Sequence, residues 1–147
     1  MVKTASQPPG MMERGSAAPD GQSSQQRSFD PESINQKAFD YYSRLRRIRA
    51  YVESHPDEAI PVRQAARISG MSETYFSSFF HQKVGVKFRD WRAHQKIVLA
   101  VQLLEARNRT ITEVAMETGF GDLRTFQRTF KRHTGLTPRQ YKRVVSP

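Results

Sequence analysis

The sequence predicts an all-α protein in which two helix-turn-helix lobes are joined by a long linker helix, after a disordered N-terminal tail. A short pattern of residues occurs twice, apolar residues recur at helical spacing, and no segment shows the alternation of apolar and polar residues that is typical of strands. The expected boundaries are 1–29 for the tail, 30–86 for the first lobe with its N-terminal helix, 87–107 for the linker helix and 108–147 for the second lobe.

The N-terminal segment is predicted to be disordered. It is rich in Ser, Gln, Gly and Pro, for example at residues 7–10 and 21–26. Such a composition buries too little apolar surface to offset the entropy lost on ordering the chain. The whole chain has no cysteine, which excludes disulfides, thiolate nucleophiles and thiolate-bound zinc.

A first helix is predicted to begin near residue 30. Asp30 can accept hydrogen bonds from free backbone N–H groups, Pro31 suits the first helical position, and Glu32 favours the positive end of the helix dipole. His55 before Pro56 ends this helix. The apolar positions that form one predicted buried stripe are Ile34, Ala38, Tyr41, Leu45, Ile48 and Val52.

The repeated pattern begins with Ala66 to Gly70 and recurs as Ala115 to Gly119, and each copy is typical of a short helix, a turn and a second helix. Phe76, Phe80 and Gly85 recur as Phe126, Phe130 and Gly135, at a register of 49 residues that becomes 50 after the first glycine. The expected helices span 62–69, 73–84, 88–106, 112–118 and 123–134, with a last one from Pro138. Predicted helix ends are Gly70, Gly85, Gly119 and Gly135, and predicted N-caps are Ser72, Asp122 and Thr137.

The charge favours a polyanionic partner. The formal net charge is +10, and residues 37–147 carry a net +11 whereas residues 1–36 carry a net −1. From Arg124 to Pro147 there are seven cations and no carboxylate, so the second lobe is expected to hold phosphate most strongly. No apolar run approaches the roughly 18 residues that span a bilayer, and the N-terminal residues lack the apolar core of a signal peptide. We therefore expect a cytoplasmic protein without membrane contact.

The second helix of each copy predicts one apolar face and one face free for DNA. The expected core side holds Tyr75, Phe76, Phe79 and Phe80 in the first copy, and Phe126, Phe130 and Leu136 in the second. On the free face of the second copy, arginine can pair bidentately with guanine and glutamine with adenine, whereas the first copy offers only shorter polar groups beside Glu73. The candidate DNA-binding residues are Thr74, Ser77, Ser78, Gln82, Leu123, Arg124, Gln127, Arg128, Lys131 and Arg132.

Residues 60–143 contain three motifs, which are Ala66-x-x-x-Gly70-Met71-Ser72 with Phe80 and Gly85, Ile111-Thr112-Glu113-Val114-Ala115-x-x-x-Gly119-Phe120-Gly121-Asp122, and Phe126-x-x-x-Phe130-Lys131-Arg132-x-x-Gly135-Leu136-Thr137-Pro138-x-x-Tyr141. These motifs are the basis of a resemblance to the AraC/XylS family of bacterial transcription regulators. It implies two recognition helices in successive major grooves and base-reading roles for Thr74, Ser77, Ser78, Leu123, Arg124, Gln127 and Arg128. A linker helix over 88–106 would measure roughly 28 Å. When the size of the lobes at its two ends is allowed for, this length suits major grooves about 34 Å apart.

The resemblance also implies an activator that contacts RNA polymerase. Family members commonly carry an effector-binding or dimerisation domain, for which the residues before the match leave too little room. We therefore expect a short form that binds promoter DNA as a monomer, unless the chain is a piece of a longer protein. Gly121 stands where the family usually has serine, so capping of the second recognition helix is expected to depend on Asp122.

Two other functions remain open at this point. The protein could be a nucleoid-type architectural protein that binds any duplex, or an interaction module that sequesters another regulator. Val98 and Val101 are extra apolar residues on the linker helix, beyond Ile97, Ala100 and Leu104, and are expected either to pack against a lobe or to bind a partner protein. No residue pattern indicates an enzyme or a cofactor, Trp91 is predicted to be core, and His55, His81, His94 and His133 are predicted to be surface or phosphate-contact residues.

Overall fold

The computed structural model describes residues 28–106 and 108–145, and over these ranges it is helical, as predicted. The expected tail, apart from Ser28 and Phe29, lies outside the described residues. None of the described helices is both long enough and apolar enough to cross a bilayer. The elements are η1 (Pro31–Ser33), α3 (Lys37–Tyr41), α4 (Ser43–Ser54), α5 (Val62–Ser69), α6 (Glu73–Val84), α7 (Phe88–Glu105), α8 (Ile111–Glu117), α9 (Leu123–Thr134) and α10 (Pro138–Val145).

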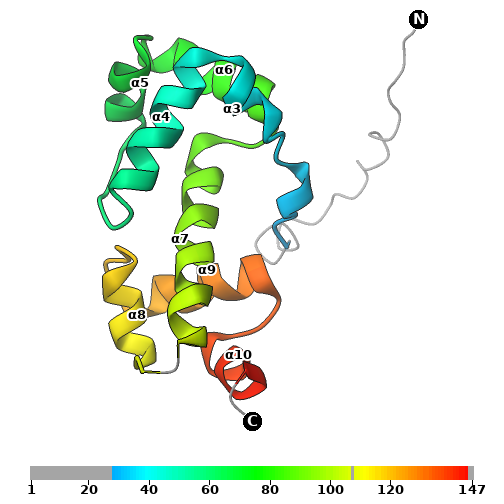
Figure 1. The fold of residues 1–147 in the computed structure, drawn as a ribbon, viewed down its shortest axis with the longest axis vertical. Coiled ribbons are helices and arrows are strands. Elements are labelled where there is room, and N and C mark those ends of the chain that lie inside the picture. The colour runs from blue at the N-terminus through cyan, green and yellow to red at the C-terminus, as the bar shows by residue number, and fades with distance from the viewer. Residues whose placement is uncertain (1–27, 107, 146–147) are drawn as a thin grey trace, which may run out of the picture.

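Helix α7 runs between two separate apolar cores, with α3 to α6 around one end and α8 to α10 around the other (Figure 1). It supplies Phe88 and Trp91 to the first core, and Ile97, Ala100 and Leu104 to the second. This confirms the predicted linker helix and the burial of Trp91. The other fully buried large side chains are Phe39, Leu45, Ile48, Val52, Phe76, Phe80 and Val84 in the first core, and Phe126 and Phe130 in the second.

The repeated helices begin and end where the turn residues predict. Gly70, Gly85, Gly119 and Gly135 all have positive φ, between 75° and 98°, a conformation that is easiest for glycine. The Ser72 hydroxyl accepts a hydrogen bond from the Tyr75 N–H at 3.2 Å, and the N–H of Gln140 donates to the Thr137 hydroxyl at 3.1 Å. Thr110 and Glu113 form a reciprocal capping box at the start of α8, which was not among the predicted caps.

The prediction of one continuous first helix was wrong. The chain forms η1, then α3, and breaks at Tyr42, whose backbone is extended, before α4 begins. Phe39 and Leu45 are both fully buried, although six residues on one helix would place them about 120° apart. The break allows both side chains to face the same core, and it leaves Tyr41 78% exposed instead of buried.

The two valines of α7 differ in burial. Val101 is partly buried and packs against the second core, whereas Val98 is 42% exposed. Packing against a lobe therefore accounts for Val101, whereas Val98 is covered only in part.

Two cations of α7 hold the backbone where the lobes meet. The buried Arg92 donates from Nη2 to the carbonyl oxygens of His55, Pro56 and Glu58, at 3.2, 3.1 and 2.8 Å. One turn further on, Lys96 donates to the Gly119 carbonyl at 3.2 Å. Burial lowers the pKa of Arg92 and that of Lys96, and the charge of Arg92 lowers the latter further.

Gly119 lies directly against the first lobe at this point. A Cβ atom at Gly119 would lie 2.7 Å from the carbonyl oxygen of Asp57, in the loop between α4 and α5. In Figure 1 this loop lies next to the turn between α8 and α9. The approach of two backbones therefore requires glycine at this turn, in addition to the positive φ of 86°.

Candidate nucleic-acid interface

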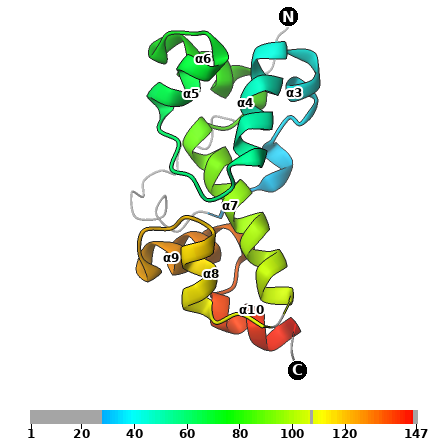
Figure 2. The same cartoon turned by 60° about the vertical axis from the view of Figure 1, so that its left-hand side comes forward.

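The second helices of the two repeats, α6 and α9, lie on the same side of α7, one above the other (Figure 2). Each has twelve residues, a side-chain cap at its start and a glycine at its end. Asp122 caps α9 by accepting from the Thr125 N–H at 2.7 Å, as expected in the absence of serine at residue 121. This hydrogen bond is the main reason that the pKa of Asp122 is lowered, and it fixes the carboxylate as a cap rather than as a free surface charge.

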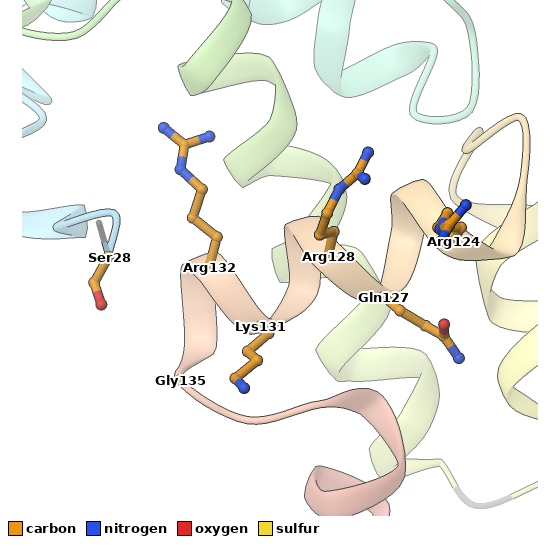
Figure 3. Close-up of a pocket in the computed structure, with 7 residues that line it drawn as sticks. All are labelled: Ser28, Arg124, Gln127, Arg128, Lys131, Arg132 and Gly135. Carbon is orange, nitrogen blue, oxygen red and sulfur yellow. The ribbon is translucent and has the colours of Figure 1, made fainter. Parts of the chain in front are cut away.

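The solvent side of α9 lines a groove of about 670 Å³ with four cations and one amide. Figure 3 shows that the side chains on this face of the helix point away from it in different directions; they are Arg124, Gln127, Arg128, Lys131 and Arg132. Phe126 and Phe130 occupy the opposite side and are fully buried, as predicted. The five polar groups are therefore held by a fixed helix while their side chains remain accessible to a partner.

The outer side of α6 lines a second groove, of about 620 Å³. Ser77 and Ser78 lie here together with His81, and cations at the start of α7 also line the groove. Arg132 of α9 lines this groove as well as the first one. Arg132 therefore links the groove that holds Ser77 and Ser78 to the groove along α9.

Two cations at the start of α7 were not among the predicted binding residues. Lys87 and Arg89 line the second groove, to which both α6 and α9 contribute, and both are exposed. Asp90 is also there, where its carboxylate oxygen lies 3.5 Å from a guanidinium nitrogen of Arg132. The sequence contained a sign of these residues, since Lys87 and Arg89 follow Gly85 at the start of a predicted helix. Acidic residues are usual at a helix start, so two basic residues there are unexpected.

All ten residues predicted to bind DNA are exposed, but they are not all gathered in the two grooves. Thr74 and Gln82 lie on α6, and Leu123 begins α9, outside the residues that line these grooves. Tyr75 was predicted to be core, and this was wrong. It is 54% exposed and lines a separate surface groove with Phe79 and other aromatic residues.

The histidines differ from the prediction that all are surface or phosphate-contact residues. His81 is exposed in the second groove, but His133 is only 8% exposed, on the inner side of α9. Burial and the nearby His94 lower the pKa of His133 to about 4. His133 is therefore neutral at pH 7 and does not add to the positive charge of the surface.

Comparison with known proteins is consistent with this arrangement. The profile described as a helix-turn-helix domain matches residues 65–144, which is more than half of the chain. An uncharacterised HTH-type transcriptional regulator of Bacillus subtilis, YobQ, is 32% identical over 96 residues, covering 65% of this chain and 40% of YobQ. The chain therefore spans about two fifths of the length of that relative.

Solved structures show the same helix arrangement. The DNA-binding domain of the transcriptional factor AdpA, solved in complex with a target DNA, is similar with a TM-score of 0.63 and 27% identity, covering 66% of this chain and 87% of that one. A transcriptional regulator from Chromobacterium violaceum with an AraC-type DNA-binding domain has a TM-score of 0.65 at 21% identity, covering 71% and 93%, which is a likeness of fold. From the profile match over residues 65–144 and the repeated motifs within them, the chain belongs to the AraC-type helix-turn-helix family.

Proposed function

We propose that the protein is a transcription regulator that binds double-stranded promoter DNA as a single copy, with α6 and α9 in successive major grooves. The observation that carries the proposal is the connected surface on which both recognition helices expose polar side chains, with Arg132 shared between the two grooves. The likeness to the AdpA domain, which was solved with its target DNA, supports this assignment. Such a protein would act in the cytoplasm, on the nucleoid.

Within this surface, α9 is proposed to read most of the sequence. Arg124 and Arg128 can each pair with a guanine, and Gln127 between them can pair with an adenine. Leu123, at the start of the helix, can contact a thymine methyl group. Lys131 and Arg132, nearer the end of α9, are proposed to hold phosphates rather than bases.

Helix α6 is proposed to contribute less to base recognition and more to position on the duplex. Thr74, Ser77, Ser78 and Gln82 carry hydroxyl and amide groups, which hydrogen-bond to phosphates as readily as to base edges. The cations of the α7 start, Lys87 and Arg89 on the wall of the second groove, are proposed to hold the backbone that lies between the two major grooves.

The experiment that tests base reading is selection of bound sequences from a random DNA pool, followed by titration of single variants. We expect an extended asymmetric site with two read segments. Arg128→Ala and Arg124→Ala should each cost about 1–3 kcal/mol of binding free energy at the cognate site, and Ser77→Ala or Ser78→Ala should cost less. Arg139→Ala is the matched control, because it removes an exposed arginine of α10 that lies outside both grooves.

The same titrations separate the other functions. Equal affinity for every duplex, with a steep dependence on salt, would replace specific regulation by an architectural role. Tight binding of a protein to the exposed Val98 together with negligible affinity for DNA would replace it by sequestration of another regulator. Activation through RNA polymerase follows from the family resemblance and is tested by transcription from a promoter that carries the selected site.

A further inference from the structure

A short segment before α3 connects the two lobes on one side of α7. We call residues 29–35 the brace; they comprise Phe29, Asp30, the 3-10 turn η1, Ile34 and Asn35. In Figure 1 the brace lies on the opposite side of α7 from the loop that contacts Gly119. It lies outside residues 65–144, so it is not part of the domain that the family profile describes.

At its start the brace is attached to the second recognition helix. The backbone N–H of Phe29 donates to the carbonyl oxygen of Arg132 in the last turn of α9, at 3.0 Å. The Phe29 ring lies 4.3 Å from the His133 ring and 5.2 Å from the His94 ring, and it also packs against the first core. Both ring nitrogens of His133 lack a hydrogen-bond partner among the described residues, so this imidazole serves as a packing surface for Phe29.

At its end the brace is attached to the first recognition helix. The backbone N–H of Asn35 donates to the carbonyl oxygen of Val84 at 2.7 Å, and its side-chain amide donates to that of Lys83 at 3.1 Å. Just beyond this helix, a Cβ atom at Gly85 would lie 2.6 Å from the Ser33 carbonyl oxygen. The last carbonyls of a helix have no partner within it, so the brace caps the C-terminal ends of both α6 and α9.

The middle of the brace resists stretching. Asp30 caps the turn by accepting from the N–H of Glu32 at 3.0 Å, and the ring of Pro31 restricts the backbone at its start. Ile34 is buried in the first core, which fixes the chain between the two attachments. A movement of α9 relative to α6 would therefore break backbone hydrogen bonds at one end of the brace or the other.

We propose that the brace is a positioning element that fixes the separation and rotation of α6 relative to α9, and thereby makes the protein selective for the spacing between its two read DNA segments. Phe29 and Asn35 are positioning residues in this proposal, since they act on the recognition helices from behind. The selectivity rests on the proposed function, whereas the fixed separation does not. One inserted base pair moves the second segment by about 3.4 Å and rotates it by about 35°, which a rigid pair of helices cannot follow.

The first test measures the geometry without DNA. Because the chain has no cysteine, Ala50→Cys in α4 and Thr112→Cys in α8 would place spin labels at two exposed positions, one in each lobe. In the full chain we expect a narrow distribution of distances between the labels. Phe29→Ala combined with Asn35→Ala should broaden it while the helical circular dichroism is retained. An unchanged distribution would overturn the proposal.

A matched pair of glycine variants checks that the contact itself is responsible. Gly85→Ala places a Cβ atom against Ser33, whereas Gly70→Ala in the same lobe meets no atom within 4 Å, although both positions have positive φ. We expect Gly85→Ala to broaden the distance distribution and Gly70→Ala to leave it narrow. Equal effects of the two variants would attribute the change to helix strain and contradict a role for the brace.

The second test measures spacing with DNA. The selected site is compared with sites in which one base pair is inserted or removed between the two read segments. The wild type should bind the altered sites about tenfold more weakly or worse, whereas the Phe29→Ala and Asn35→Ala double variant should discriminate less than about threefold. Retained discrimination in a double variant with broadened distances would overturn the proposal. Absence of any preferred sequence in the wild type would instead refute the proposed function, while the label distances would still report on the brace.

Discussion

Gly119→Ala should destabilise the protein far more than Gly135→Ala, and this comparison tests the contact between the lobes. Both glycines belong to the second lobe and both have φ of 86°. They differ in their surroundings, since a Cβ atom at Gly135 meets nothing within 4 Å whereas one at Gly119 meets the backbone of Asp57. The pair therefore separates the cost of backbone strain from the cost of the contact.

The expected loss of unfolding free energy is the sum of the backbone strain and the steric contact. An alanine in a left-handed conformation costs about 1–2 kcal/mol, and this applies to both variants. At Gly119 the new atom would also lie 2.7, 3.1 and 3.2 Å from the carbonyl oxygen, carbonyl carbon and Cα of Asp57. A main-chain segment that Arg92 holds through three carbonyls cannot move aside freely, so we add about 1–3 kcal/mol for the forced shift.

Urea denaturation followed by circular dichroism measures both variants against the wild type. We expect a loss of unfolding free energy of about 1–2 kcal/mol for Gly135→Ala and about 2–5 kcal/mol for Gly119→Ala. The denaturant slope should be unchanged in both, so that the midpoints report stability. Losses that agree within error would show that the backbones of the two lobes do not meet at this point in solution.

Two further predictions concern buried cations and histidines. Arg92→Met should cost about 2–3 kcal/mol of unfolding free energy, because it removes the donor shared by three backbone carbonyls. The control is Arg89→Met, on the exposed side of the same helix, which should cost little. Equal costs would contradict a role for Arg92 in holding the loop backbone. The pKa of His133, lowered to about 4 by burial and by His94, means that the unfolded chain takes up a proton below pH 6.5 before the folded protein does. The stability that depends on neutral His133 is therefore fully present above pH 6.5 and is lost as the pH drops towards 4, by about 2 kcal/mol of unfolding free energy at pH 5. His133→Phe should flatten this part of the pH profile, as measured by denaturation at a series of pH values.

The repeated lobes could be predicted from the sequence because local signals decide them. Caps at Ser72 and Asp122 and the left-handed glycines act within one helical turn. They predict the end of α5 and both bounds of α6 and α9. The exposed face of α9 followed from the same periodicity, since burial of Phe126 and Phe130 leaves the arginines outside.

The features that escaped prediction depend on residues far apart in the chain. The break at Tyr42 exists so that Phe39 and Leu45 can both enter the first core. Burial of His133 needs Phe29, which is more than a hundred residues earlier in the sequence. Lys87 and Arg89 line the second groove only because α7 begins close to both α6 and Arg132 of α9. No periodicity within one segment reports such contacts.

Because one uninterrupted helix donates side chains to both cores, neither half of the molecule is a detachable module. A cut within α7 would leave Trp91 or Leu104 without its helix and would open the corresponding core to water. Melting of one half should therefore propagate into the other through this shared helix, so that amide hydrogens in both exchange in the same cooperative event.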